Sequence, residues 1–299
     1  MPAPETQHYY DKYSDDTAHL LQNMGDKFKD TMVVKSLEGE GANFINQYGE
    51  TEAREDDSRR GETPHMDVPR YRRWVFPRTV EWGHLVDQRD VIRTLGDPTQ
   101  AVQKAGVMAV ARKIDLTVII PAFFATAKTG QNGETDVTFP SSQQVTAATG
   151  GGGSATGLNL EKFRAAHEIL QINEAPGPDD EGYEQPISII TPKQNRNLLA
   201  DYQAASKEFQ NGVVIMGQYV REVYGTRILV RNGLELNGST ERRCPLYLKS
   251  GMGLGLWPLD VAWAKERPDR KGNTQLFNQK VVGATRLEEK KVVELICAE

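Results

Sequence analysis

Seven arginines between residues 54 and 78 carry the clearest chemistry in this 299-residue sequence. No lysine occurs between residues 36 and 103, although lysine would serve equally well if solvation were the only need. A guanidinium group is planar, forms paired hydrogen bonds with carboxylates and stacks on aromatic rings. Trp74 and Trp82 stand beside these arginines among β-branched residues, which is typical of exposed strands. These residue types predict a surface that binds carboxylates or aromatic side chains of another molecule.

Such a surface could contact a second copy of this chain, a nucleic-acid backbone or only solvent. A second copy of this chain is favoured, because acidic residues are abundant elsewhere: 41 Asp and Glu stand against 36 Lys and Arg, a net charge of −5. A nucleic-acid backbone and plain solvent are the alternatives. The acidic balance excludes a polybasic binder of duplex DNA, whose pI would exceed about 9. The residues that we expect to make inter-subunit contacts are Arg59, Arg60, His65, Arg70, Arg72, Arg73, Trp74 and Arg78.

Patterns that would indicate catalysis are missing. The sequence has no Gly-x-Ser-x-Gly turn, no phosphate-binding Gly-x-x-x-x-Gly-Lys loop and no His-Glu-x-x-His zinc motif. Its five histidines are not paired at metal-ligand spacing, and the acidic residues at 179–184 lack the spacing of a calcium loop. The spaced glycines at 251–255 indicate a tight bend rather than a dinucleotide site. We therefore expect a protein that is not an enzyme, with no catalytic residue, no cofactor and no metal.

Cysteine usage and hydropathy indicate the environment. Cys244 and Cys297 are too few for a disulfide framework or a cysteine-based zinc site, and they fit a reducing compartment such as a cytoplasm. The polar first residues lack the apolar run of a secretory signal. No stretch approaches the roughly 18 apolar residues of a membrane span, so we expect no membrane partner.

The N-terminal segments have little capacity to form a core. Residues 1–50 contain a short amphipathic pattern at 15–29, followed by glycines, and should become ordered only against a partner surface. Residues 51–90 should form an extended, arginine-rich hairpin that lies across another molecule. Both segments are typical of a protein that works as an assembly.

The strongest helix signal lies at residues 97–130. Asp97 can cap this helix, Pro98 suits its first turn, and Gly130 marks its end. An apolar stripe follows one face, at Val107, Ala111, Ile114 and Val118. About 30 residues at 1.5 Å each would span roughly 45 Å, which is long for a globular helix. Pro121 should kink the helix or end it early.

The C-terminal half alternates helices with strand-rich runs. A helix is predicted at 159–172, and a second at 192–202 with Thr191 as its cap. From residue 186 onward, short β-rich runs separated by turns predict mostly antiparallel strands. The predicted fold class is therefore α+β.

The order of these segments resembles that of the major capsid proteins of tailed bacteriophages. The resemblance is carried by residues 59–65, by Arg72-Arg73 and the aromatic strand to Trp82, by 85–87, by Asp97-Pro98 opening the long helix, by Gly130 and Gly133, and by 283–293. It covers the chain from about residue 50 to its end. The fold that it implies is the Hong Kong 97-type capsid fold.

The resemblance also implies how the chain is divided. Residues 1–50 would be an N-terminal arm, and residues 51–90 the extended loop, a β-hairpin that overlaps a neighbouring subunit. Residues 91–185 and 263–299 would form the peripheral domain with its long spine helix. Residues 186–262 would form the axial domain, which meets its copies at the capsomer centre.

The implied function is structural. Copies of the chain would assemble into hexamers and pentamers of an icosahedral phage head around double-stranded DNA, which they would contact without sequence specificity. Assembly in the host cytoplasm would use a separate scaffolding protein, because only about 50 residues precede the loop, and a portal protein; a decoration protein is a further possible partner. An encapsulin-like shell of a cellular nanocompartment is the alternative. A soluble hydrolase or a nucleic-acid-binding module is disfavoured by the missing catalytic pairs and the acidic charge.

One departure from the family concerns covalent joining. Some members link subunits through a lysine on the extended loop and an asparagine on a neighbour. This sequence has no lysine between residues 36 and 103, so the loop lacks that donor. We expect a shell that is held together non-covalently.

Overall fold

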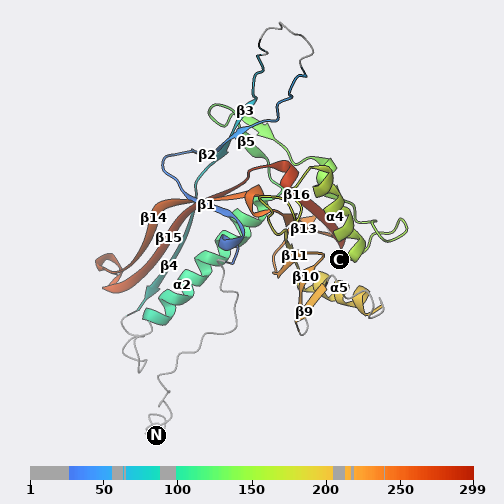
Figure 1. The fold of residues 1–299 in the computed structure, drawn as a ribbon. Helices are drawn as coiled ribbons and strands as arrows, with labels where there is room; N and C mark the ends of the chain where they lie inside the picture. Colours follow the sequence, from blue (N-terminus) through green and yellow to red (C-terminus); the bar gives the residue numbers. More distant parts are fainter. Residues whose placement is uncertain are drawn as a thin grey trace.

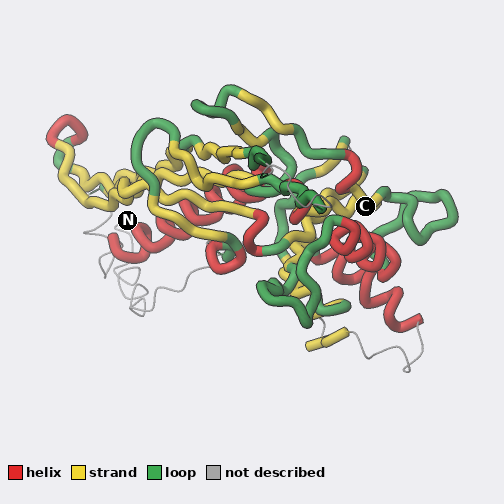
Figure 2. The backbone as a smooth tube through the Cα atoms, turned by 45° about the horizontal axis from the view of Figure 1, so that its top comes forward, coloured by secondary structure: helices red, strands yellow, loops and turns green. Residues whose placement is uncertain are grey.

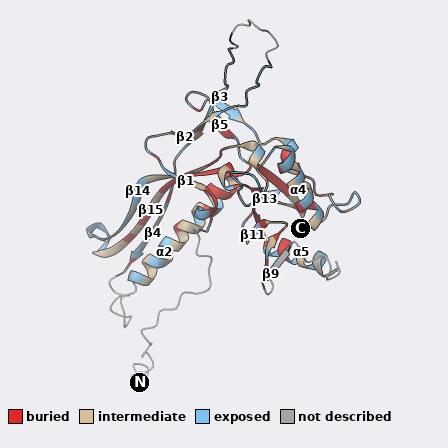
Figure 3. Ribbon diagram, in the orientation of Figure 1, coloured by how far each residue is buried: buried red, intermediate tan, exposed pale blue. Residues whose placement is uncertain are grey.

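Three β-sheets make up much of the described chain, which comprises residues 27–299 apart from 56–62, 64, 88–98, 205–212, 217–218 and 239. The computed structural model shows the sheets converging near the middle of the molecule (Figure 1), and buried residues concentrate there (Figure 3). Neighbouring strands are mostly antiparallel, with parallel pairing at β1–β14, β8–β11 and β7–β16. The predicted α+β class with mostly antiparallel strands is confirmed.

The first sheet is long and carries a helix on one face. Its strands, in spatial order, are β1 (Val33–Ser36), β14 (Met252–Arg267), β15 (Asn273–Arg286) and β4 (Arg78–Val86). Helix α2 (Thr99–Ile114) packs against β4 and β15 and runs along the strands (Figure 2). The approach is close because Gly106 has no side chain: a Cβ there would lie 2.3 Å from the ring of Trp82.

The long helix ends earlier than residue 130. α2 continues through a π-helical segment (Asp115–Ile119) into α3 (Ile120–Ala122), where it stops; the expected cap at residues 97 and 98 lies outside the described residues. Pro121 explains this end, because it has no N–H to donate to the carbonyl of Thr117. The guanidinium of Arg78 donates to that carbonyl at 3.2 Å. The predicted early end at Pro121 is therefore confirmed.

The second sheet encloses the principal core with two helices. Its strands, in spatial order, are β7 (Gln144–Val145), β16 (Val292–Ala298), β13 (Glu241–Tyr247), β8 (Ile187–Ile190), β11 (Thr226–Val230), β10 (Tyr219–Val223) and β9 (Val213–Met216), with β12 (Leu236–Asn237) beside β13. The helices are α4 (Leu160–Ile172) and α5 (Pro192–Ala204). Both predicted helices are confirmed: Asn159 accepts the Lys162 N–H at 2.9 Å, and Thr191 Oγ1 accepts the Gln194 N–H at 3.3 Å.

The third sheet is small and stands at the top of Figure 1. Its strands are β2 (Ala42–Tyr48), β3 (Arg70–Val75), β5 (Ala127–Thr129) and β6 (Thr135–Val137). Strand β3 pairs with β2, whereas β4 pairs with β15 in the first sheet. The expectation of a hairpin closed within residues 51–90 is therefore wrong. Pro77 biases its neighbour toward extended backbone, so the chain passes from one sheet to the next without reversing.

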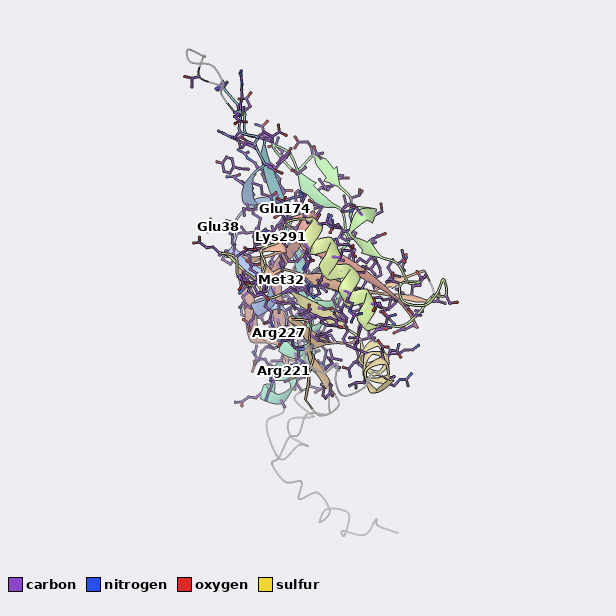
Figure 4. All side chains as sticks on the ribbon, turned by 45° about the vertical axis from the view of Figure 1, so that its right-hand side comes forward. Met32, Glu38, Glu174, Arg221, Arg227 and Lys291 are labelled. Carbon is purple, nitrogen blue, oxygen red and sulfur yellow. The ribbon has the colours of Figure 1, made fainter. Side chains whose placement is uncertain are left out.

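The described part of the N-terminal arm is built into its own subunit. Phe28 and Met32 are each 1% exposed and belong to the principal core, where Tyr247 donates to the hydroxyl of Thr31 at 2.8 Å. Figure 4 shows Met32 in the interior and Glu38 at the periphery. The expectation that residues 1–50 order only against a partner surface is wrong from residue 27 onward. Residues 1–26, with most of the predicted helix at 15–29, lie outside the described residues.

Two of the glycines at 251–255 serve a purpose other than the predicted bend. Gly253 and Gly255 lie within strand β14, in extended backbone. A Cβ on Gly255 would lie 2.4 Å from Leu37 Cδ1, and one on Gly253 would lie 2.7 Å from the ring of Phe44. Glycine is needed here because the arm crosses the sheet at this point. The tight-bend interpretation holds for Gly251, which lies in the turn Lys249–Gly251, and is replaced by close packing at Gly253 and Gly255.

Gly283 provides a test of this packing. A Cβ at this position would lie 2.5 Å from the backbone oxygen of Phe76, which cannot move as a side chain could. We expect Gly283→Ala to lower the free energy of unfolding by about 1–3 kcal/mol, measured by urea denaturation. Gly83→Ala is the matched control in strand β4, since its nearest atoms lie 3.8 Å away. Equal stability of the two variants would contradict the packing argument.

The sheets cross the expected domain limits at two places. The limit between residues 262 and 263 falls within β14, a continuous strand. Strand β16, expected in the peripheral domain, pairs with β13, which lies within 186–262. The assignment of these ranges to named domains stays a prediction.

Candidate subunit-contact surface

The outward face of the β2–β3 pair forms an arginine-rich groove. Tyr48 pairs with Arg70 and Asn46 with Arg72, so these four side chains lie on one face. The opposite face turns toward the body, where Gln47 Nε2 donates to the Leu287 carbonyl at 2.8 Å. The groove, bounded by β2, β3 and the β5–β6 turn, has a volume of about 560 Å³. It is wide enough to receive side chains from another molecule.

Exposed aromatic and cationic groups define the chemistry of this groove. Tyr48 is 68% exposed and Tyr71 is 54% exposed, which is high for residues of their size. The Arg70 guanidinium lies 5.7 Å from the centre of the Tyr48 ring, in the geometry of a cation–π contact. Within the described part of the chain, no ion pair involves Arg70 or Arg72. The charge of these two arginines is therefore not neutralised by a carboxylate of the described residues.

The described flanks of the segment between β2 and β3 lead away from the body. Figure 1 draws its flanks rising from the third sheet, and Met66 and Val68 on the returning flank are exposed. His65 is also exposed and lies 3.6 Å from the Asp67 carboxylate. Arg59 and Arg60 lie outside the described residues. The described flanks thus project from the third sheet, and their overlap with a neighbouring subunit stays a prediction.

Three further predicted contact residues contact other parts of their own chain. Arg73 is 7% exposed and donates to Glu289 at 2.5 Å. Trp74 Nε1 donates to the Gly130 carbonyl at 2.9 Å, which ties β3 to the turn after β5. Arg78 contacts the π-helical segment, as described above. Burial leaves Arg73 little surface for another subunit, because its position on β3 turns it toward the body.

A buried arginine beneath the groove was not identified from the sequence. Arg286 Nη1 donates to the carbonyls of Phe123 and Ala125 at 2.8 and 3.0 Å, and Nη2 donates to that of Val137 at 3.3 Å. Its Nε lies 3.4 Å from Glu289, which therefore serves both Arg286 and Arg73. Burial lowers the pKa of Arg286, and the charge of Glu289 opposes this shift. This cluster fixes the third sheet to the end of the long helix.

The described residues hold little that suggests chemistry on a substrate. They contain no group of three or more His, Cys, Asp and Glu side chains placed to hold a metal ion. Cys244 and Cys297 are both free and buried, and hydrogen bonding with the Cys297 thiol, together with burial, raises the pKa of Cys244. None of the helices in the described ranges is long and apolar enough to cross a membrane.

Comparison with known proteins points to shell proteins. The sequence model of the family described as phage capsid protein matches residues 6–299. No curated protein sequence matches the chain. The capsid protein of the cyanophage P-SCSP1u is similar in structure, with a TM-score of 0.73 and 15% identity over 99% of this chain and 95% of that one. The capsid of Ralstonia phage GP4 has a TM-score of 0.71 and 11% identity, over 96% and 94% of the two chains.

A shell of another kind is similar as well. The SrpI encapsulin complex from Synechococcus elongatus contains a chain with a TM-score of 0.64 and 9% identity, over 99% of this chain and 95% of that one. At such identities the structural likeness shows the fold, and the expected Hong Kong 97-type capsid fold is confirmed. Because the family model spans nearly the whole sequence, this chain belongs to the phage capsid protein family.

Proposed function

We propose that this chain is the major capsid protein of a tailed phage and that it forms hexamers and pentamers around double-stranded DNA. The projecting β2–β3 loop, with the exposed Arg70 and Arg72 at its base, is the observation that carries the proposal. The described flanks of this loop bury little within their own subunit, and we expect them to gain stabilisation by lying on a neighbour. Ring-closing heterologous contacts repeated around each capsomer then stabilise the shell.

The neighbouring subunit supplies the other half of each contact. The chain carries a net charge of −5, so a second copy offers carboxylates to Arg70, Arg72 and the loop arginines Arg59 and Arg60. A bidentate arginine–carboxylate pair fixes orientation as well as affinity. His65 lies on the same flank and extends the contact surface. No covalent joining is needed, and the loop has no lysine for it.

The direct test is negative-stain electron microscopy of the purified protein beside a sizing column. Closed shells or regular capsomers are the expected result, with a co-expressed scaffolding protein added where the chain alone stays monomeric. On a denaturing gel, boiled and reduced shells should give one band near 33.3 kDa, because the contacts are non-covalent. A ladder of bands would contradict non-covalent joining. A chain that stays monomeric with every candidate scaffold would contradict the shell function.

The family resemblance also implies partners beyond the chain itself. We infer a separate scaffolding protein and a portal protein during assembly in the host cytoplasm, and non-specific contact with packaged DNA in the virion. The acidic balance suits a wall that surrounds DNA without holding it tightly. A decoration protein would bind the finished shell.

An encapsulin-like compartment is the second candidate, favoured by the likeness to the SrpI shell. The two functions differ in content. Particles purified from the native source should contain DNA if the chain forms a phage head. Particles that instead contain one enzyme and no DNA would establish the compartment.

A further inference from the structure

Helix α2 is basic, although the chain as a whole is acidic. Its 16 residues include Lys and Arg side chains but no Asp or Glu, whereas the chain has a net charge of −5. A groove runs between α2 and the β14–β15 ribbon, and Lys29, Lys104 and Lys280 line it. Among the described residues that line this groove, Asp260 alone carries a carboxylate. The charge around α2 is therefore locally positive, which favours the binding of anions.

The side of α2 that turns away from the first sheet is basic and mostly short-chained. Gly106 and Val110 face the sheet, where Gly106 packs against the ring of Trp82. The opposite side is formed by residues at spacings of three and four, namely 101, 104, 105, 108 and 112. Positions 101 and 105 are alanines, so a partner can approach the helix closely beside Lys104 and Arg112. Figure 1 shows α2 lying along the strands on one side of this sheet.

The distance between the two cations suits a duplex backbone. Lys104 and Arg112 are eight residues apart, which is about 12 Å along the helix axis. Duplex DNA carries one phosphate charge per roughly 1.7 Å of its axis, so cations at this distance meet phosphates in many positions of the duplex. An acidic protein segment has fewer charges, and they would have to match this one spacing. The arrangement therefore favours DNA over an acidic protein as the partner.

We propose that this outer side of α2 contacts the phosphate backbone of duplex DNA, through Lys104 and Arg112, without reading its sequence. Lys104 is exposed, and no ion pair within the described ranges involves it. The inference rests on the proposed function, because DNA inside a shell is a polyanion that every subunit would meet. Two phosphate contacts per subunit are weak singly, which agrees with a wall that surrounds DNA without holding it tightly.

Salt-dependent binding of the full chain to DNA tests the proposal. The chain is used before assembly, because a closed shell would keep the probe from an inner surface. The probe is a short fluorescein-labelled duplex, and fluorescence anisotropy gives its affinity between about 50 and 200 mM salt. Each phosphate contact adds about 0.9 to the steepness with which log affinity falls against log salt concentration. Across this range, Lys104→Gln with Arg112→Gln should therefore lose about twelvefold less affinity than the unmodified chain.

The control removes one Lys and one Arg elsewhere, in Lys265→Gln with Arg270→Gln. Lys265 lies on the other face of the β14–β15 ribbon from Asp260, because side chains alternate along β14, and Arg270 lies at the turn that joins the two strands. This control should keep the salt dependence of the unmodified chain. Equal salt dependence of the α2 variant and the control would overturn the proposal. Tighter binding of poly-glutamate than of the duplex would overturn it too, by assigning α2 to an acidic protein partner.

Folding and shell formation are measured separately from DNA binding. Gln is nearly as good a helix former as Lys and Arg, so the α2 variant should keep its unfolding midpoint in urea. Lys104→Gln alone should remove about half of the effect, which keeps the test valid if the double variant is less stable. Shells that package DNA while the α2 variant leaves the salt dependence unchanged would refute the DNA contact alone. A chain that shows the expected change but never forms shells would refute the proposed function and leave the contact.

Discussion

Arg286→Met is expected to lower the free energy of unfolding by about 3–5 kcal/mol, the range for removing one partner of a buried ion pair. The change leaves the carbonyls of Phe123, Ala125 and Val137 without their guanidinium donor. Glu289 keeps only Arg73. Because a domain is stable by roughly 5–15 kcal/mol, this loss is a large fraction of the total free energy of unfolding. Urea denaturation followed by circular dichroism measures the loss.

An exposed ion pair on the β14–β15 ribbon is the matched control for Arg286. Arg267 contacts Asp269 at 2.6 Å, but their side chains are 41% and 55% exposed. Arg267→Met should therefore cost less than about 1 kcal/mol. The comparison separates burial from ion pairing as such, since both arginines have a carboxylate partner. Similar losses in the two variants would contradict the role assigned to the buried cluster.

Local signals in the sequence predicted the helices well. Asn159 and Thr191 stand immediately before α4 and α5, and both caps form as expected. Pro121 predicted the early end of the long helix for the same reason: the cause and its effect lie within one turn. The fold class followed from the order of such segments. These features depend on residues that are close together in the sequence, so the sequence alone is enough to predict them.

Pairing between distant segments could not be predicted in this way. The sequence of β3 and β4 indicates two strands, but nothing in it shows that they join different sheets. Gly253 and Gly255 read as a bend because the arm residues Leu37 and Phe44 that pack against them lie more than 200 positions away.

Burial divides the arginines of β3 in a way that their types do not reveal. Arg72 and Arg73 are neighbours, yet alternation along the strand turns Arg73 inward to Glu289 and Arg72 outward. Arg286 showed no signal at all, since its partners are backbone carbonyls of other segments. The candidate contact surface therefore stays a prediction, and the sequence alone could not separate the roles of its members. Only the register with β2 and the contact with Glu289 separate them.

Charge reversal at the outward arginines is expected to abolish shells while leaving the subunit folded. In Arg70→Glu with Arg72→Glu, both side chains are exposed and neither has an ion-pair partner among the described residues, so stability should change by less than about 0.5 kcal/mol. Each inter-subunit contact, however, would set like charges against each other. If the repulsion costs roughly 1.4 kcal/mol, the association constant of each contact falls about tenfold. A shell contains many such contacts, so the effect on assembly is multiplied. Particle yield by electron microscopy and the unfolding midpoint are measured on the same samples.

Two further variants show what kind of contact is lost. Arg70→Lys with Arg72→Lys keeps the charge but removes the planar fork, so it should lower particle yield less than charge reversal does. Arg73→Glu should instead unfold the subunit, because it places a second carboxylate beside Glu289 at a position that is 7% exposed. Normal shells from the double glutamate variant would contradict the contact surface. If that variant lost both its shells and its fold, Arg70 and Arg72 would instead contribute to the stability of their own subunit. The loop arginines would then be tested by the same two measurements, particle yield and the unfolding midpoint.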